Sequence, residues 1–290
     1  MKQNYIDCHT HTNLSPDGEN TPSEMCEKAI ELGLSVYAIT DHCECSTWFD
    51  EKYYRDRDIP KSKDPFVVYD YKSRFYSAIE CMQKLRIQYG DKLNLICGVE
   101  LGQPTQGYEG AEEVAENSNL DFIIGSLHQI RNHDDFAFLR YDNKDKADIR
   151  NLLSAYYEEM LEMVNRGKFD VLGHLTYPLR YIEGEAGISI DMKPHEEKVR
   201  EIFKLIISKG KGIEINTSGL FQQYGKTFPT IEYVKLYREM GGEILSIGSD
   251  AHNTSSLGRG VEQGLELAET AGFKYITYFK ERKPIFLKII

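Results

Sequence analysis

Short apolar runs alternate with longer amphipathic segments along almost the whole chain. Each short run has the length of a β-strand, is apolar nearly throughout and then turns polar. This pattern is typical of strands that are buried on both faces of a parallel sheet. Seven runs are therefore predicted to be strands: 4–11 (NYIDCHTH), 35–42 (SVYAITDH), 93–102 (LNLICGVELG), 121–128 (DFIIGSLH), 169–175 (FDVLGHL), 212–219 (GIEINTSG) and 243–252 (EILSIGSDAH).

The segments between these runs have the apolar spacing of helices. In residues 21–34, Thr21 is predicted to cap a helix that begins at Pro22, Glu24 to complete its capping box, and Gly33 to end it. Further helices are predicted over residues 147–168, 194–212, 229–242 and 258–273. Repeated strand–helix units favour a parallel sheet, and about seven of them favour an α/β barrel over an open sheet. We expect residues 1–290 to form one such domain.

Composition narrows the range of partners. The 290 residues carry a formal net charge of -11, so no basic surface for nucleic acid or anionic lipid is expected. No apolar stretch reaches the roughly 18 residues of a membrane span. The six cysteines show no zinc-knuckle spacing and no signal peptide precedes them, which predicts free thiols and a cytoplasmic location. The oligomeric state is not predicted.

Metal-binding side chains recur where the predicted strands end. The carboxyl ends of the strands are where a parallel barrel gathers its active site. A lone histidine there is more often structural, but six of the eight histidines occupy such a position, which favours a metal site. The polar residues at these ends are His9, His11, Asp41, His42, Glu100, His128, His174, Asp250 and His252.

The spacing of these residues has a physical reason. Residues i and i+2 of a strand point to the same face, so His9 and His11 can reach one ion. Asp7 is expected beneath them as an orienting partner or weak ligand. Asp250 and His252 have the same i, i+2 spacing at the end of the last predicted strand. Glu100 ends an apolar strand, where a carboxylate is costly unless it is paired or metal-bound. Glu100 is therefore the natural bridge between two ions.

The motifs H-x-H, ITDH, GVE, GSLH, GHL and GSDAH occur in this order along the chain. Together they resemble those of the polymerase and histidinol phosphatase family of metal-dependent phosphoesterases. The resemblance implies a distorted, TIM-like (β/α)7 barrel with two or three divalent ions, Zn, Mn or Fe, at the carboxyl ends of its strands. It implies one ion held by His9, His11, Glu100 and Asp250, a second held by Glu100, His128 and His174, and a third held by His42 and His252.

Asp17 stands near the position at which some members of the family have a further histidine for the third ion. The resemblance thus implies that Asp17 is a metal ligand, and an aspartate suits a harder metal than histidine does. Asp41 precedes His42 and is expected to support a ligating histidine rather than to bind metal itself.

The same resemblance implies the reaction. Ions that share a water molecule would lower its pKa and produce a hydroxide that attacks phosphorus. Asp250, His252, Arg180 and Arg259 are expected to be catalytic, the two arginines also binding the phosphate of a small substrate. The carboxyl-terminal sequence and the long aromatic segment 44–68 resemble the branch of the family that hydrolyses L-histidinol phosphate to L-histidinol and phosphate, in histidine biosynthesis. Weaker candidates for contacts with the rest of the substrate are Glu183, Glu185, Asn216 and Ser218.

Three other functions remain open. The same metal site could serve another phosphomonoester, such as phosphotyrosine, and the pocket formed by residues 44–68 and 177–187 would decide between them. An amidohydrolase is disfavoured because no predicted strand ends in the metal-bridging lysine that those enzymes usually carry. A non-catalytic, metal-binding regulatory protein is disfavoured by the complete ligand set.

Overall fold

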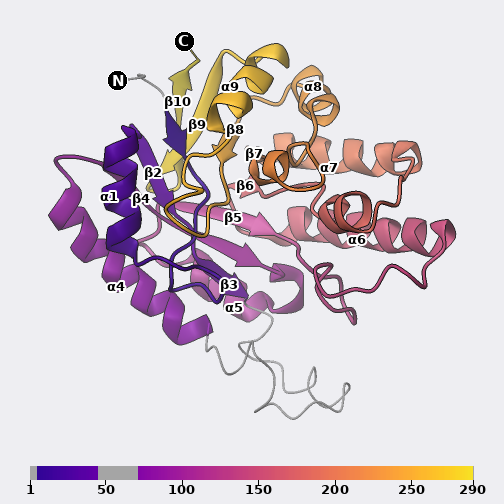
Figure 1. The fold of residues 1–290 in the computed structure, drawn as a ribbon, viewed down its shortest axis with the longest axis horizontal. Helices are drawn as coiled ribbons and strands as arrows, with labels where there is room; N and C mark the ends of the chain where they lie inside the picture. Colours follow the sequence, from indigo (N-terminus) through magenta and orange to yellow (C-terminus); the bar gives the residue numbers. More distant parts are fainter. Residues whose placement is uncertain (1–4, 45–70, 290) are drawn as a thin grey trace.

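The structure is a computed structural model that describes residues 5–44 and 71–289. Its main sheet is parallel, and its strands follow the order β1-β2-β4-β5-β6-β7-β8 (Figure 1). A short strand, β3, pairs with the carboxyl-terminal part of β4. The strands are β1 (Ile6–Asp7), β2 (Val36–Ile39), β3 (His42–Glu44), β4 (Asn94–Gly102), β5 (Phe122–Ser126), β6 (Val171–Leu172), β7 (Gly212–Asn216) and β8 (Leu245–Gly248).

Backbone contacts between the first and last strands nearly close this sheet. The amide of Cys8 donates to the carbonyl of Ile247 at 3.0 Å, and Thr10 pairs with Ala251 in a parallel bridge. Every residue of β2, β5, β7 and β8 is buried, as the continuous apolar runs predicted. The predicted seven-stranded α/β barrel is therefore confirmed. Seven strands follow one another around the sheet, and β3 only adds a short pairing to β4.

Helices surround the barrel, with α1 and α4 on one side and α6 and α7 on the opposite side (Figure 1). Thr21 caps α1 in a complete capping box and Gly33 ends it with a left-handed φ of 72°, as predicted. Two helices, α4 and α5, were not predicted. The helices are α1 (Pro22–Leu32), α4 (Tyr71–Tyr89), α5 (Tyr108–Ala115), α6 (Lys146–Arg166), α7 (Glu196–Ser208), α8 (Ile231–Glu239) and α9 (Val261–Thr270).

The chain ends in an unpredicted antiparallel hairpin of β9 (Tyr275–Lys280) and β10 (Lys283–Lys288). Its turn docks beneath the barrel, where the amide of Glu281 donates to Asp121 at 2.9 Å and Nε of Arg282 donates to Asp170 at 2.7 Å. These two aspartates directly precede β5 and β6. The hairpin thus covers the amino ends of the strands and leaves the opposite end to the polar residues.

Within residues 5–44 and 71–289, no helix is both long enough and apolar enough to cross a membrane. The predicted long segment 44–68 lies outside the described residues, apart from Glu44 at the end of β3.

Candidate metal centre

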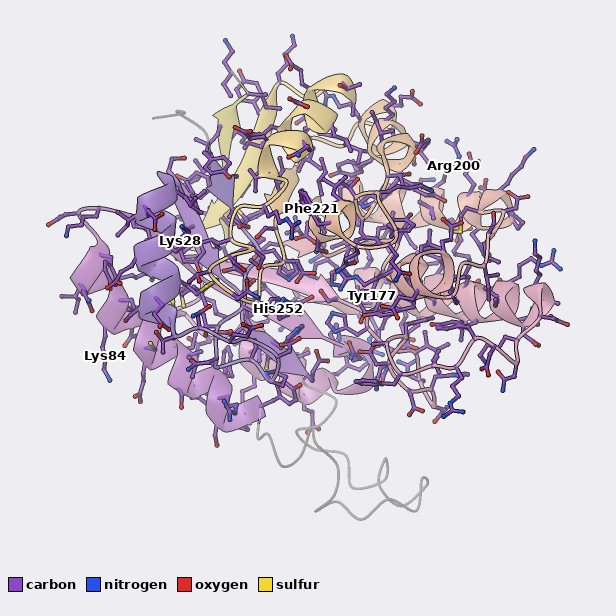
Figure 2. All side chains as sticks on the ribbon, viewed as in Figure 1. Lys28, Lys84, Tyr177, Arg200, Phe221 and His252 are labelled. Atoms are coloured by element: carbon purple, nitrogen blue, oxygen red, sulfur yellow. The ribbon has the colours of Figure 1, made fainter. Side chains whose placement is uncertain are left out.

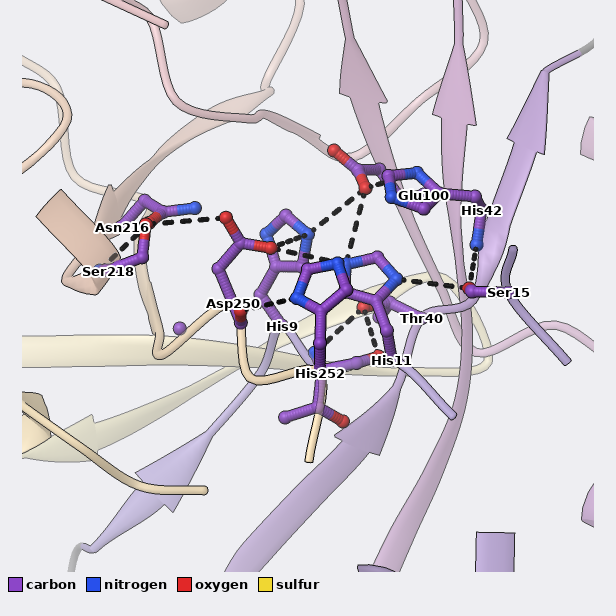
Figure 3. Close-up of polar contacts among 12 residues, drawn as sticks. His9, His11, Ser15, Thr40, His42, Glu100, Asn216, Ser218, Asp250 and His252 are labelled. Atoms are coloured by element: carbon purple, nitrogen blue, oxygen red, sulfur yellow. Dashed lines mark hydrogen bonds and ion pairs between the residues drawn. The ribbon is translucent and has the colours of Figure 1, made fainter. Parts of the chain in front are cut away.

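Glu100 lies at the centre of a cluster of histidines at the carboxyl end of the barrel (Figure 3). Its Oε2 atom lies 3.3 Å from Nε2 of His9 and 3.4 Å from Nε2 of His11. Oδ1 of Asp250 lies 3.6 and 3.2 Å from the same two nitrogens. Ligands about 2.1 Å from a tetrahedral zinc ion are about 3.4 Å apart, so each of these nitrogen–oxygen distances is close to that of two ligands of one ion. His9, His11 and Glu100 offer three ligand atoms that all lie within 4.8 Å of one another.

The other oxygen of Glu100 faces a second group. Oε1 lies 2.8 Å from Nε2 of His174 and 3.1 Å from Nε2 of His128, and these two nitrogens are 3.3 Å apart. Ser126 donates to the same oxygen at 2.7 Å, which holds the carboxylate in place. A single buried carboxylate therefore joins two sets of donor atoms, the arrangement expected of a bridge between two ions.

A third group lies toward the cavity mouth. Oδ2 of Asp17 is 3.0 Å from Nε2 of His252 and 3.7 Å from Nε2 of His42. The rings of His42 and His252 both stack on the ring of His11, with centroids 4.2 and 4.3 Å away. The other nitrogen of His42 lies 2.9 Å from Oε2 of Glu100. This group is thus continuous with the first, but Asp17 is 53% exposed, so its carboxylate lies at the solvent edge.

Several donor atoms of the cluster are buried without a hydrogen-bond partner. They include Nε2 of His9, Nε2 of His11 and Oε2 of Glu100. Buried polar atoms are normally paired, because leaving one unpaired costs about 1–3 kcal/mol. Two imidazole nitrogens and a carboxylate oxygen that converge in this way fit a divalent cation, which would satisfy all three.

The pKa shifts of the cluster also indicate that its carboxylates require nearby positive charge. Burial alone would raise the pKa of Glu100, but His42, His9 and His128 hold it well below its usual range. Burial would lower the pKa of His128, yet Glu100 and Glu44 raise it to about 10. Protons on imidazoles therefore balance the carboxylates in the metal-free protein. Metal ions would take over this role.

Two buried acidic residues that were not predicted support the ligands. Oε1 of Glu214 lies 2.6 Å from Nδ1 of His9, and its Oε2 accepts a hydrogen bond from the amide of His174 at 3.0 Å. Oε1 of Glu44 lies 3.2 Å from Nδ1 of His128. Both glutamates face the nitrogen that points away from Glu100, so they can fix which nitrogen is free to bind metal.

Asp7 and Asp41 stabilise the loops that carry the ligands. Asp7 accepts hydrogen bonds from the amide of Ser249 at 2.9 Å and from its hydroxyl at 2.5 Å. It thus ties the ends of β1 and β8 together, which fits the supporting role of the two roles predicted for it. Asp41 accepts from the hydroxyl of Ser15 at 2.9 Å, and this hydroxyl lies 3.3 Å from Nδ1 of His11. Asp41 therefore supports a histidine indirectly.

The two predicted phosphate-binding arginines lie in different places. Nη2 of Arg180 is 3.0 Å from Oδ2 of Asp250 and 2.8 Å from the hydroxyl of Ser218, beside the histidine cluster. Arg259 is exposed and stacks on the ring of Phe221, with its guanidinium carbon 3.9 Å from the ring centre. The described residues that line the site cavity include Arg180 but not Arg259, so the structure gives the prediction for Arg259 no support.

A cavity of about 480 Å³ opens above the cluster. Seven of the nine predicted ligands line it, all except His9 and His11. Its wall also carries Tyr177, Arg180 and Tyr181, within the predicted segment 177–187. In Figure 2, Tyr177 and His252 lie in the central part of the molecule, whereas Lys28, Lys84 and Arg200 lie toward its periphery. Glu183, Glu185, Asn216 and Ser218 are not among the described residues that line this cavity.

Comparison with known proteins identifies the class to which this fold and site belong. The family model of the PHP domain matches residues 7–218, and the chain is therefore a member of the PHP domain family. The "Probable histidinol-phosphatase" of Thermotoga maritima is 27% identical over 271 residues, which are 93% of this chain and 94% of that protein. The histidinol-phosphatase of Lactococcus lactis is 24% identical over 282 residues, 96% of this chain and 95% of that protein.

The fold also matches a solved structure. Histidinol phosphate phosphatase from Lactococcus lactis, crystallised in complex with zinc, L-histidinol and phosphate, superimposes with a TM-score of 0.69. The match covers 97% of this chain and 98% of that one at 22% sequence identity. At this identity the likeness establishes the shared barrel fold.

Proposed function

We propose that this chain hydrolyses L-histidinol phosphate to L-histidinol and phosphate with the help of two or three divalent metal ions. The observation that carries the proposal is the bridging position of Glu100, whose two oxygens face two separate sets of histidines. The choice of substrate is supported by relatives named histidinol-phosphatase that align along almost the whole chain. An enzyme of this kind, with the free cysteines found among the described residues, suits the cytoplasm.

The residues divide into three ligand sets. His9, His11, Glu100 and Asp250 would hold one ion, and Glu100, His128 and His174 a second. Asp17, His42 and His252 would hold a third, at the more exposed side. The zinc in the Lactococcus lactis structure supports zinc here, while Mn and Fe also accept imidazole and carboxylate ligands. Bound ions would supply an activated water near neutral pH and neutralise the charge of the phosphoryl oxygens.

Arg180 would bind the phosphate. Its Nη2 is held by Asp250 and Ser218, so the side chain is oriented before a substrate arrives. Its Nε is buried without a partner and can donate to a phosphoryl oxygen. Because Asp250 also lies 3.2 Å from Nε2 of His11, it connects the arginine directly to the first ligand set.

The proposal is tested by phosphate release from a panel of phosphomonoesters. Purified protein is loaded with Zn, Mn or Fe and assayed with L-histidinol phosphate, phosphotyrosine and p-nitrophenyl phosphate, with elemental analysis of the same sample. We expect kcat/KM for L-histidinol phosphate to exceed the others by about 100-fold or more, since recognition of polar groups discriminates strongly. A preference for phosphotyrosine would replace the substrate, and no phosphate release with any metal would refute the enzymatic function.

A pair of variants tests the location of the site. Glu100→Gln removes the charge shared by two ligand sets, so we expect loss of bound metal and of nearly all activity. Glu112→Gln, on the exposed face of α5, is the control and should retain both. Unchanged metal content and kcat in Glu100→Gln would show that the site lies elsewhere.

A further inference from the structure

Asp135 is an acidic residue of the cavity wall that belongs to none of the three ligand sets. It follows β5 in the loop that leads to α6. Its Oδ1 accepts two hydrogen bonds, from the hydroxyl of Tyr177 at 3.0 Å and from the amide of Ala137 at 2.8 Å. None of the described residues donates a hydrogen bond to its Oδ2. The carboxylate is thus fixed by one oxygen while the other remains available.

The position of Asp135 relative to the metal cluster is set by Tyr177. The ring of Tyr177 packs against the rings of His128 and His174, with centroids 5.0 Å from each. Its hydroxyl, at the far end of the ring, donates to Asp135 and lies within hydrogen-bond distance of the hydroxyl of Tyr181, at 3.0 Å. The side chain of Tyr177 therefore separates Asp135 from His128 and His174, and all four residues line the same cavity.

Starting from the function proposed above, we infer that Asp135 binds the ammonium group of the substrate. This contact would make the enzyme selective for phosphomonoesters that carry an ammonium group near the ester. A phosphate bound at the cluster and Arg180 leaves the rest of the substrate to extend along the cavity wall. L-Histidinol phosphate carries an ammonium on the carbon next to its ester carbon. The free oxygen of Asp135 is the acceptor that such a group requires.

The remaining wall suits the rest of the molecule. Tyr181 and Phe138 line the same cavity, and Phe138 is 69% exposed although it is a large apolar residue. Aromatic side chains offer flat apolar faces on which an imidazole ring can stack. Burial raises the pKa of Asp135, and the nearby His128 opposes this shift only in part. A bound ammonium would further stabilise the charged carboxylate.

The test compares two substrates that differ only in the amine. These are L-histidinol phosphate and 3-(imidazol-4-yl)propyl phosphate, which keeps the imidazole and lacks the ammonium. The measured quantity is the ratio of their kcat/KM values. We expect the wild-type protein to favour the amine by about 10- to 100-fold, and Asp135→Asn to lose most of this preference, because a charge-assisted hydrogen bond is removed.

Two further variants separate recognition from structure. Asp142→Asn removes an exposed carboxylate of the same loop and should keep the wild-type ratio. Tyr177→Phe removes one donor to Asp135, so we expect a smaller loss of the preference, about 2- to 10-fold. Activity with 3-(imidazol-4-yl)propyl phosphate, which lacks the amine, shows whether each variant still folds and binds its metals.

The outcomes distinguish this inference from the function on which it rests. An unchanged ratio in Asp135→Asn, or an equal loss with both substrates, would overturn the role of Asp135 while histidinol phosphate remains the substrate. If the wild-type protein instead hydrolyses only other phosphomonoesters, the matched pair becomes ethanolamine phosphate and ethyl phosphate. The role of Asp135 then requires that Asp135→Asn lower the ratio of their kcat/KM values in the same way. If no phosphomonoester is hydrolysed, both proposals fail.

Discussion

Nδ1 of His9 lies 2.6 Å from Oε1 of Glu214, and both side chains are buried. Glu214 lies on β7 and His9 follows β1, so residues 205 positions apart meet inside the barrel. Because a carboxylate accepts hydrogen bonds, Nδ1 carries the proton of the neutral ring and Nε2 is free to face Glu100 and Asp250. Gly248 of β8 makes room for this contact, since a Cβ there would overlap that of His9.

Glu214→Gln is therefore expected to weaken metal binding without removing a ligand. The amide keeps the shape of the side chain but loses the charge that orients His9 and makes it more basic. A loss of about 10- to 100-fold in zinc affinity is expected for such a supporting group. Competition with a chromophoric chelator measures the affinity. Glu112→Gln is the control, and equal affinities in the two variants would contradict the supporting role.

Asp17→Asn should affect one ion selectively. Asp17 lies close to His252 and His42 but is not part of the sets around Glu100 and Asp250. We expect the variant to lose about one metal equivalent per chain after mild dialysis, because a neutral amide is a weaker ligand than a carboxylate. Elemental analysis of the dialysed protein checks this. Asp91→Asn, in an exposed turn, should keep the wild-type content, and complete metal loss in Asp17→Asn would refute a separate third set.

The barrel and the positions of the ligands could be predicted because both follow from local patterns. Continuous apolar runs predicted the buried strands, and the polar residues that end them had to meet once the strands were parallel. The capping box of α1 is also local, since it involves only Thr21 and Glu24. The grouping of His9, His11, Glu100 and Asp250 was implied by the family resemblance. The structure places the two histidine nitrogens 3.2–3.6 Å from the two carboxylate oxygens.

Other parts of the site depend on tertiary contacts that have no sequence pattern. Glu44, Asp135 and Glu214 act through neighbours far away in the chain, and an isolated glutamate or aspartate gives no sign of this. Asp250 has a left-handed φ of 55°, a rare conformation for a residue other than glycine, which directs its carboxylate to two histidines.

The carboxyl-terminal hairpin was missed for a similar reason. Tight two-residue turns usually carry glycine or asparagine, because these residues tolerate positive φ. Here the turn residues Glu281 and Arg282 adopt φ values of 50° and 61°. Their contacts with Asp121 and Asp170 hold them in this conformation, so the turn is set by docking and not by its own residues.

Arg180→Ala is expected to raise KM for the phosphomonoester by about 10- to 100-fold, since it removes charged donors to the phosphate. The metals should remain, because Arg180 contacts Asp250 only through Oδ2, whereas Oδ1 faces the histidines. Steady-state kinetics and elemental analysis check both statements. Arg166→Ala, on the exposed face of α6, is the control. Unchanged kinetics in Arg180→Ala would remove this arginine from the phosphate site.

Metal binding should release protons and strengthen as the pH rises. In the metal-free protein, His128 has a pKa raised to about 10 from an ordinary value of 6.5, and the pKa of His9 is also raised, mainly by Glu214 and Glu100 against the effect of burial. Both rings therefore carry a second proton near pH 7, and a metal ion that binds Nε2 must displace it. Calorimetric titration with zinc in buffers of different ionisation enthalpy should show the release of at least about one proton per chain.

The same protonation predicts how thermal stability depends on pH. A group whose pKa is raised on folding stabilises the folded protein at pH values below its pKa in the unfolded state. That stabilisation is lost as the pH rises through its pKa in the folded state. For His128 this window runs from about 6.5 to about 10. The Tm of the metal-free protein should fall across it, while that of the zinc-loaded protein falls less, so the gap between them widens. Glu100→Gln lacks the main anion that holds the proton on His128 and should show a smaller fall in the metal-free state. A gap that is constant with pH, together with no proton release, would show that protons do not balance this cluster.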